Sequence, residues 1–304
     1  MISIQQMQYI LVLSEEQQFQ RASEKCFVTQ PTLSMQLKKA ENTLGSAIFD
    51  RSTSPLELTP FGELLLPIVR DILSEYGRIS ELTEKQKGVY RERVRIGIIP
   101  TVADYMVPDL FNKWKSVLTD VQLSIEEMKT EDVLIALDQK KIDIGILAGP
   151  VNDPKLRTSV LFREEILAFV PESKAKEVTT EDLGNHHPWL LTSGNCLRTQ
   201  MIHFCSLNTE RDDWNYEGGN LELLKQMVVM NGGYTLIPER SISKKTNDYK
   251  RIRSSIGEIP ARQIIALSPN RSTKWGSIEQ IVRSVQLNYG DKKNGEELKL
   301  LSWE

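Results

Sequence analysis

Two of the three cysteines of this chain, Cys196 and Cys205, lie nine positions apart. If residues 194–205 form one continuous helix, nine steps of about 100° place the two thiols on opposite faces, and a rise of about 1.5 Å per residue separates them by roughly 13 Å. A disulfide requires Cα atoms about 4.4–6.8 Å apart. The thiols could therefore join only if the helix unwound, and such a bond would act as a switch. The spacing also fits two buried thiols that serve as small apolar side chains.

The composition of the chain indicates where this chemistry would take place. The 304 residues are 40% hydrophobic and 26% charged with a net charge of −3, which fits a globular protein of two or three domains without a general nucleic-acid signal. No apolar run is long enough to span a membrane, and residues 1–6 have no signal-peptide features. We therefore expect a cytoplasmic protein without a membrane partner, in which a disulfide is more often regulatory than structural.

The first 60 residues have the pattern of three helices. Apolar residues at helical spacing predict one helix near residues 7–13 and another over about 18–26. A third begins near Pro31, whose missing N–H costs nothing at the first helical position. This helix has leucines facing inward and Gln, Ser, Thr and Lys elsewhere, which is typical of a helix that reads the DNA major groove. The turn residues 50–55 fit a β-hairpin wing. Because the segment is not basic overall, a plain three-helix bundle is the alternative.

Residues 91–304 alternate between predicted strands and helices, which indicates an α/β fold with a parallel sheet covered on both faces. The elements predicted for a first unit are strands over 94–99, 121–128, 142–147 and 264–267 and helices over 107–114, 131–138 and 278–287. Those predicted for a second unit are strands over 166–170 and 189–191, a helix over 221–230, and a turn and strand over 232–238.

Several motifs in residues 1–60 resemble the DNA-binding domain of LysR-type transcriptional regulators. They are Phe19-Gln20-Arg21-Ala22-Ser23, Val28-Thr29-Gln30-Pro31-Thr32-Leu33-Ser34, Glu41-Asn42-Thr43-Leu44-Gly45 and Phe49-Asp50-Arg51. The resemblance implies a winged helix-turn-helix over 1–60 that binds double-stranded promoter DNA. The residues that it places at the DNA are Gln30, Pro31, Thr32, Ser34, Gln36, Lys38 and Arg51.

The resemblance also implies how the rest of the chain is organised. A long linker helix over 61–90 would pair two chains, and the apolar seam from Leu65 to Ile79 has the required spacing. Residues 91–304 resemble the periplasmic-binding-protein-like effector domain of the family, with subdomain I over about 91–162 and 264–304 and subdomain II over about 163–263. The ligand site would lie in the cleft between them. A homodimer or homotetramer acting with RNA polymerase is expected.

Within that family, the segment from Gly194 to Cys205 and the run 220–228 resemble peroxide sensors of the OxyR type. This implies that hydrogen peroxide oxidises Cys196, that Cys205 resolves the product into a disulfide, and that a cellular thiol reductant resets the switch. The residues placed around the peroxide are Thr101, Thr130, Asn195 and Arg198. A guanidinium such as Arg198 would favour the thiolate of Cys196. One departure is Asn195, which stands where histidine is typical and which cannot take a proton at neutral pH.

The sequence thus predicts a peroxide-sensing regulator that activates oxidative-stress genes, and other functions stay open. An ordinary regulator of the family would bind a small metabolite in the cleft and have inert cysteines. For either threonine at the cleft, a helix cap is the alternative role. A thiol peroxidase is disfavoured because the chain has no Cys-x-x-Cys motif and no phosphate-binding loop, so neither an enzyme nor a cofactor is expected. A metal site from Cys196, His203 and Cys205 fits no standard zinc spacing.

Overall fold

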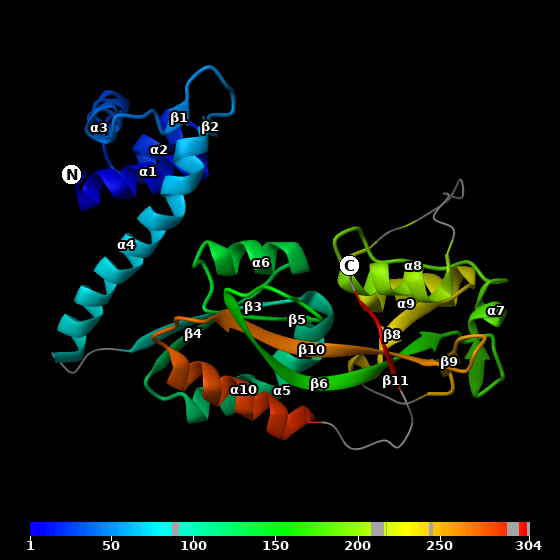
Figure 1. Cartoon of the computed structure of the whole chain (residues 1–304). Helices are drawn as coiled ribbons and strands as arrows, with labels where there is room; N and C mark the ends of the chain where they lie inside the picture. Colours follow the sequence, from blue (N-terminus) through cyan, green and yellow to red (C-terminus); the bar gives the residue numbers. More distant parts are fainter. Residues whose placement is uncertain (87–90, 208–215, 217, 243–245, 291–297, 303–304) are drawn as a thin grey trace. The chain divides into compact units, whose positions relative to one another are not determined.

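The computed structural model of the chain describes residues 1–86, 91–207, 216, 218–242, 246–290 and 298–302. The chain divides into two compact units, Met1–Arg91 and Glu92–Glu304, whose elements are labelled in Figure 1. None of the helices described in it is both long and apolar enough to cross a membrane. Each unit is considered by itself below.

Three helices and a small wing form the first unit. They are α1 (Ile4–Glu16), α2 (Phe19–Lys25), α3 (Gln30–Leu44) and the antiparallel pair β1 (Phe49–Asp50) and β2 (Glu57–Leu58). Ser3 and Gln6 form a capping box at the start of α1, and Gly45 ends α3 in a left-handed conformation with φ of 73°. Leu13, Leu33 and Leu37 are buried together in the core. The predicted winged helix-turn-helix is confirmed.

A long helix, α4 (Pro60–Gln86), completes the first unit. The Thr59 hydroxyl caps it by accepting a hydrogen bond from the N–H of Gly62 at 3.1 Å. Val69 is buried, but Ile72, Tyr76 and Ile79 are 38%, 48% and 60% exposed. The later part of the apolar seam is therefore not covered by its own chain.

The second unit is built on a nine-stranded sheet of described residues. In spatial order its path is β4 (Val121–Glu127), β3 (Glu92–Ile98), β5 (Ile144–Ala148), β10 (Ile259–Pro269), β6 (Leu156–Phe169), β9 (Tyr249–Arg253) and β7 (Glu177–Thr179). Two further strands, β8 (Thr235–Pro238) and β11 (Leu298–Leu300), pair with β6 and β10. β3 is parallel to β4 and β5, as predicted, whereas β10 is antiparallel to both β5 and β6.

Helices flank both halves of this sheet. Those of the first half are α5 (Pro100–Val117), α6 (Thr130–Asp138) and α10 (Trp275–Tyr289). Those of the second half are α7 (Thr180–Leu183), α8 (Cys196–Cys205), α9 (Leu221–Asn231) and the short 3-10 helix η1 (Glu239–Ser241). In Figure 1, α6 lies above the sheet and α10 lies below it.

Two long strands run from one half of the second unit to the other. β6 and β10 pair along their length, from Glu165 opposite Ala261 to Leu156 opposite Pro269. The subdomain boundaries predicted after residues 162 and 263 therefore fall inside continuous strands. We call the half that contains β3, β4 and β5 subdomain I and the half that contains β7, β8 and β9 subdomain II.

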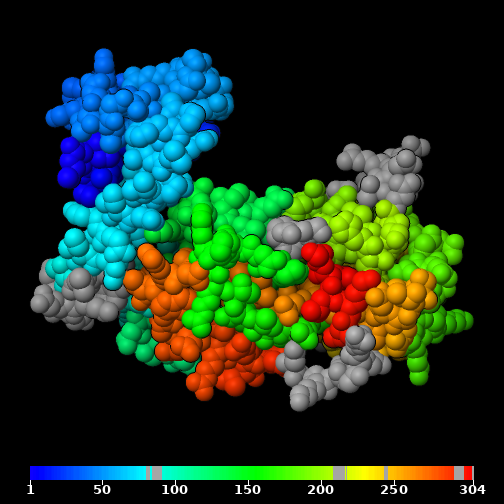
Figure 2. Space-filling view, in the orientation of Figure 1, coloured from blue at the N-terminus to red at the C-terminus, as the bar shows by residue number. Residues whose placement is uncertain are grey.

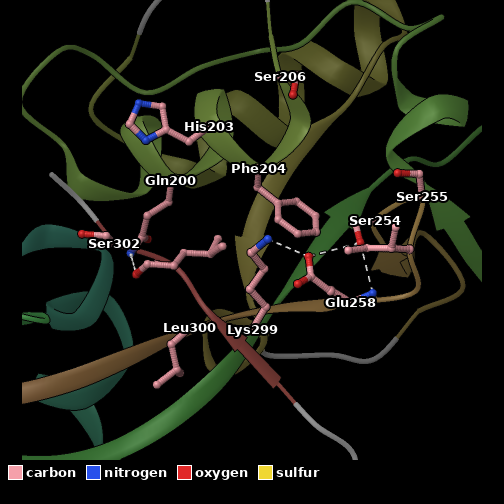
Figure 3. Close-up of a pocket in the computed structure, with 12 residues that line it drawn as sticks. Gln200, His203, Phe204, Ser206, Ser254, Ser255, Glu258, Lys299, Leu300 and Ser302 are labelled. Carbon is pink, nitrogen blue, oxygen red and sulfur yellow. Dashed lines mark hydrogen bonds and ion pairs between the residues drawn. The ribbon is translucent and has the colours of Figure 1, made fainter.

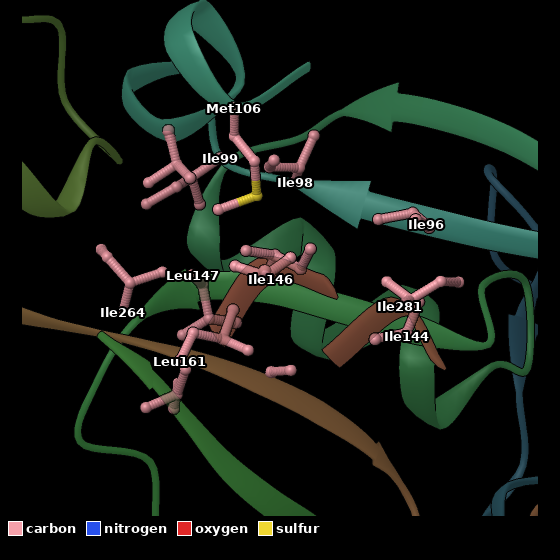
Figure 4. Close-up of a cluster of buried hydrophobic side chains, with 14 of the residues drawn as sticks. Ile96, Ile98, Ile99, Met106, Ile144, Ile146, Leu147, Leu161, Ile264 and Ile281 are labelled. Atoms are coloured by element: carbon pink, nitrogen blue, oxygen red, sulfur yellow. The ribbon is translucent and has the colours of Figure 1, made fainter. Parts of the chain in front are cut away.

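Each subdomain has its own hydrophobic core. In subdomain I, aliphatic side chains from β3 and β5 meet those of α5 and α10, as the cluster around Ile98, Met106 and Ile146 shows in Figure 4. In subdomain II, α8 and α9 contribute Leu197 and Leu224 to a separate cluster with strand residues of β6 and β8. The α8 segment is thus held against the rest of the protein by apolar contacts.

Two predicted elements differ from the structure. The segment 189–191 forms only isolated bridges, with Pro188 opposite Tyr234 and Leu191 opposite Gly218, so the predicted strand is wrong. Its apolar run reflects burial rather than strand pairing. The helix predicted over 107–114 begins earlier, at Pro100, because residues 101–103 are all buried and give no amphipathic signal.

Candidate redox site and DNA interface

Cys196 and Cys205 are the first and last residues of one continuous helix, α8, so the helical arrangement considered from the sequence is the one that the structure has, although the helix begins at Cys196 and not at Gly194. The residue before the helix, Asn195, has an extended backbone and makes no capping hydrogen bond with its side chain. Ser206 ends the helix with φ of 51°. Both cysteines are free thiols. The helix therefore keeps the two sulfur atoms unlinked.

The two thiols belong to different hydrophobic cores. Cys196 is 5% exposed and is part of the core of subdomain I, although its helix belongs to subdomain II. Cys205 is half-buried and contacts the core of subdomain II. To join, at least one sulfur must leave the core in which it lies.

Cys205 is held as a neutral thiol. Burial raises the pKa of Cys205 from its ordinary value of 9.0 to about 11, and the neighbouring Tyr234 hydroxyl offsets part of this increase. Burial and the neighbouring Cys205 raise the pKa of Tyr234 as well. At neutral pH the Cys205 sulfur is therefore almost entirely in the thiol form, which is much less nucleophilic than the thiolate.

A fully buried ion pair lies on the two long strands. Arg262 on β10 donates from Nε to Glu164 Oε1 on β6 at 2.8 Å, and both side chains have 0% exposure. Tyr105 on α5 donates to the same oxygen at 2.9 Å. Burial and the negative charge of Glu164 raise the pKa of Tyr105 well above its usual value, so the phenol stays protonated.

Arg262 connects this ion pair to Thr101 and to Cys196. Its Nη1 donates to the Thr101 hydroxyl at 2.7 Å, and its Nη2 donates to the Thr101 carbonyl at 2.9 Å. Burial acts against the charged form, but the attraction of Glu164, with a smaller one from Cys196, raises the pKa of Arg262 above its ordinary value. The guanidinium of Arg262 is thus a buried cation, held by Glu164 and Thr101, whose charge interacts with Cys196.

The other threonine of the predicted site has an unused hydroxyl. Thr130, the first residue of α6, is 2% exposed, and its Oγ1 has no hydrogen-bond partner among the described residues. Neither threonine caps a helix, because the cap positions belong to Ile99 and Lys129. A buried hydroxyl without a partner is costly and is typical of a ligand-binding position.

The two remaining predicted residues make contacts within subdomain II. The Asn195 amide donates to the carbonyl and the hydroxyl of Thr192, each at 3.0 Å. Arg198 donates from Nη1 to the Leu191 carbonyl at 2.8 Å. Their roles at the peroxide stay predictions.

Sequence reasoning missed Arg262, although a signal was present. The residue is a charged side chain inside the apolar run 259–267, and such a residue in a central strand must be paired. It also missed Gln200, which is 1% exposed on α8 and donates to the carbonyl of Leu301 at 3.1 Å.

The hydrogen bond from Gln200 to the Leu301 carbonyl joins α8 to the residue that follows the C-terminal strand β11. Leu301 follows β11 and also donates from its N–H to the Ala261 carbonyl at 2.8 Å. Together, α8, β11 and the turn before β10 line a pocket of about 450 Å³, and Figure 3 shows Gln200, Phe204 and Lys299 among its walls. The space-filling view shows the C-terminal residues on the surface next to this helix (Figure 2).

The predicted DNA-contacting residues lie on α3 and on the wing. Gln30, Pro31 and Lys38 are exposed, whereas Thr32, Ser34 and Gln36 are partly buried. Gln36 accepts a hydrogen bond from Gln6 at 3.2 Å, and the exposed Arg51 pairs with Glu41 at 2.9 Å. The exposed residues of α3 thus include Gln30 and the two positive charges of Lys38 and Lys39, together with the apolar side chain of Met35.

Comparison with known families identifies the chain. The helix-turn-helix profile of the bacterial LysR family matches residues 4–63, and the LysR substrate-binding domain profile matches residues 87–279. The chain belongs to the LysR family of DNA-binding transcriptional regulators, which are not enzymes.

Its relatives within that family are regulators named for hydrogen peroxide. The chain is 29% identical over 295 residues to a hydrogen peroxide-inducible genes activator of Dickeya chrysanthemi, a match that covers 94% of this chain and 95% of the relative. It is 30% identical over 245 residues to the dual regulator OxyR of Escherichia coli, a match that covers 79% of this chain and 80% of the relative. A full-length OxyR variant from Pseudomonas aeruginosa has a similar structure, with a TM-score of 0.71, 27% identity and coverage of 94% and 98%.

Removing the buried cation should destabilise the second unit. In Arg262→Met, Glu164 is left buried without a counter-ion, and we expect a loss of about 3–5 kcal/mol in the free energy of unfolding. Urea denaturation followed by tryptophan fluorescence measures it, since all five tryptophans lie in the second unit. Arg253→Met is the matched control, because its partner Glu177 is largely exposed and such pairs contribute at most about 1 kcal/mol. Equal losses in the two variants would contradict the role given to Arg262.

The raised pKa of Cys205 should make stability depend on alkaline pH. The folded state keeps the thiol protonated up to about pH 11, whereas the unfolded state ionises near its ordinary value of 9.0. The stabilisation that folding gains from the neutral Cys205 thiol is therefore fully present below pH 9. As the pH rises towards 11 it is lost, and the free energy of unfolding falls by about 1–2 kcal/mol. Urea unfolding of the wild type and of Cys205→Ser at pH 8, 9.5 and 10.5 should give a steeper decline in the wild type. Parallel declines would show that Cys205 is not held neutral by folding.

Proposed function

We propose that this LysR-family regulator senses hydrogen peroxide through reversible formation of a Cys196–Cys205 disulfide. The observation that carries the proposal is that one helix holds the two thiols apart, in two different hydrophobic cores. The charge of the buried Arg262 also interacts with Cys196. The relatives named as hydrogen peroxide-inducible activators support the proposal.

The chemistry has two steps. The Cys196 thiolate attacks the O–O bond of hydrogen peroxide, which gives a sulfenic acid on Cys196 and releases hydroxide that becomes water. The Cys205 sulfur then attacks the sulfenic sulfur, so the S–S bond forms, the S–O bond breaks and a second water leaves. A cellular thiol reductant would return both residues to thiols by exchange.

Four polar residues would hold the peroxide next to Cys196. The unpartnered Thr130 hydroxyl can donate a hydrogen bond, and Thr101 is fixed in place by Arg262. Asn195 and Arg198 belong to the same segment as Cys196 and would complete the surroundings. Asn195 can donate and accept hydrogen bonds but cannot act as a general base at neutral pH.

The free energy that a Cys196–Cys205 disulfide contributes is sufficient to change the conformation of subdomain II. Closing a loop of about ten residues is worth roughly 2–3 kcal/mol in the chain-entropy picture. Allosteric coupling energies are typically about 1–3 kcal/mol. The disulfide can therefore shift the balance between two arrangements of the segment around α8.

The output would be a change in how paired chains bind a promoter. The exposed apolar residues of α4 would pair two chains into a homodimer, which could associate further into a homotetramer. The recognition helix α3 would then read double-stranded DNA, and the oxidised form would recruit RNA polymerase as an activator. The protein would act in the cytoplasm, where reductants reset the switch.

Mild peroxide should link the two cysteines of α8. Tryptic peptides of the unreduced protein, analysed by mass spectrometry, should contain a Cys196–Cys205 disulfide that is absent in Cys196→Ser and present in Cys26→Ser. If peroxide leaves both thiols free in the wild type, the switch does not exist. A thermal shift with small metabolites that is unchanged in Cys196→Ser would then favour an ordinary effector-binding regulator.

Removing the charge of Lys38, one of two exposed lysines of α3, should weaken DNA binding at all sequences. In Lys38→Ala we expect the dependence of log Kd on log salt to fall by about one phosphate contact, because a lysine–phosphate contact releases counterions without reading the sequence. Fluorescence anisotropy with a promoter duplex and an unrelated duplex at several salt concentrations measures this. The exposed Lys25, which pairs with Glu16, is the control, and an equal effect of Lys25→Ala would argue against a specific role for Lys38.

A further inference from the structure

The side chain of Lys129 joins the two subdomains next to the redox helix. Lys129 occupies the cap position before α6 in subdomain I, and its Nζ donates a hydrogen bond to the carbonyl oxygen of Ser193 at 3.0 Å. Ser193 belongs to the turn that leads into Cys196 in subdomain II. The contact therefore runs from subdomain I to subdomain II and ends three residues before the first thiol, Cys196.

The turn is shaped to receive this lysine. Gly194 has φ of +87°, and a Cβ atom at this position would lie 2.9 Å from Lys129 Cδ and 3.3 Å from Nζ. A side chain at Gly194 would therefore be both strained and in conflict with the lysine. The missing side chain gives the ammonium group access to the Ser193 carbonyl.

Other contacts of the turn stay within subdomain II. The Asn195 side chain is bonded to Thr192, and the Thr192 N–H donates to the Gly218 carbonyl at 3.0 Å. Within the part of the chain that the structure describes, the hydrogen bond from Lys129 is the one that ties residues 192–195 to subdomain I. Since α8 has no side-chain cap at its start, this external contact is a support for the turn.

The ammonium group of Lys129 forms no salt bridge with the described residues. Glu126, Glu127 and Asp132 line the same surface groove as Lys129, yet none of the described carboxylates forms a salt bridge with it. Its interaction with the Ser193 carbonyl is a charge-assisted hydrogen bond, and such bonds are roughly twice as strong as neutral ones.

We infer that Lys129 is a positioning residue of the redox switch, which holds the 192–195 turn in the thiol form and must release it before the disulfide closes. This inference rests on the proposed function and adds a restraint on its second step. Among the described residues, no hydrogen bond joins Lys129 to the sulfur of Cys196 or Cys205. Lys129 should therefore slow disulfide closure without changing the oxidation of Cys196.

The test separates the two steps in the full-length protein. Trapping of the sulfenic acid with dimedone in a Cys205→Ser background measures the first step, and quenched alkylation at saturating peroxide measures closure. In Lys129→Met we expect closure to be about fivefold faster, as loss of one hydrogen bond allows, with the first step unchanged within about twofold. Lys129→Arg should restore slow closure because its guanidinium can donate to the same carbonyl. Lys155→Met, at another exposed lysine of subdomain I, should behave as the wild type.

Hydrogen exchange gives a second measurement that does not require a disulfide. In the reduced protein, amides of residues 193–197 should exchange faster in Lys129→Met than in the wild type and Lys129→Arg. If the wild type forms no disulfide but exchange responds to Lys129, the proposed function fails and the restraint stands. If the disulfide forms and Lys129→Met has wild-type closure and exchange, the inference is overturned.

Discussion

The structure depends on one constraint, namely that a single helix anchors its two terminal thiols in two separate hydrophobic cores. Cys196 lies in the core of subdomain I and Cys205 against the core of subdomain II, although only ten residues span both. Helical hydrogen bonds and apolar burial both favour this separation. Any bond between the sulfurs must therefore be formed against the packing of the native state, which makes oxidation and conformational change a single event.

The buried ion pair of Arg262 and Glu164 lies on strands β10 and β6, near the start of this helix. Arg262 and Glu164 lie on the two strands that both subdomains share, and a cation without exposure keeps its charge only because of its partners. The same guanidinium fixes Thr101 and lies near Cys196. If Cys196 reacts as proposed, its chemistry and the stability of the shared strands are linked through one side chain, Arg262.

The sequence alone was sufficient for much of this arrangement, since local patterns determine it. Helical periodicity and caps located the winged helix-turn-helix, and the cysteine spacing showed that the two thiols cannot join while their segment is helical. It did not show that the two thiols lie in different cores, nor that Arg262 approaches Cys196 from a strand about 65 positions later. Those contacts are set by tertiary packing and have no local pattern. The strand predicted over 189–191 was wrong for the same reason. Tertiary packing buries this apolar run without strand pairing, and the sequence pattern of such a run resembles that of a strand.

The location of Cys196 among aliphatic side chains has a consequence for how such a regulator could be adjusted. If its sulfur leaves, the surrounding isoleucines and leucines lose contacts, and vacated core space costs about 24 cal/mol per Å³. That cost adds to the energy required for oxidation. Exchanges as small as isoleucine for valine, at positions that meet neither oxidant nor DNA, would raise or lower the dose at which a cell responds. The sensitivity to oxidant would then be set by the packing around Cys196, while the reactive groups stay the same.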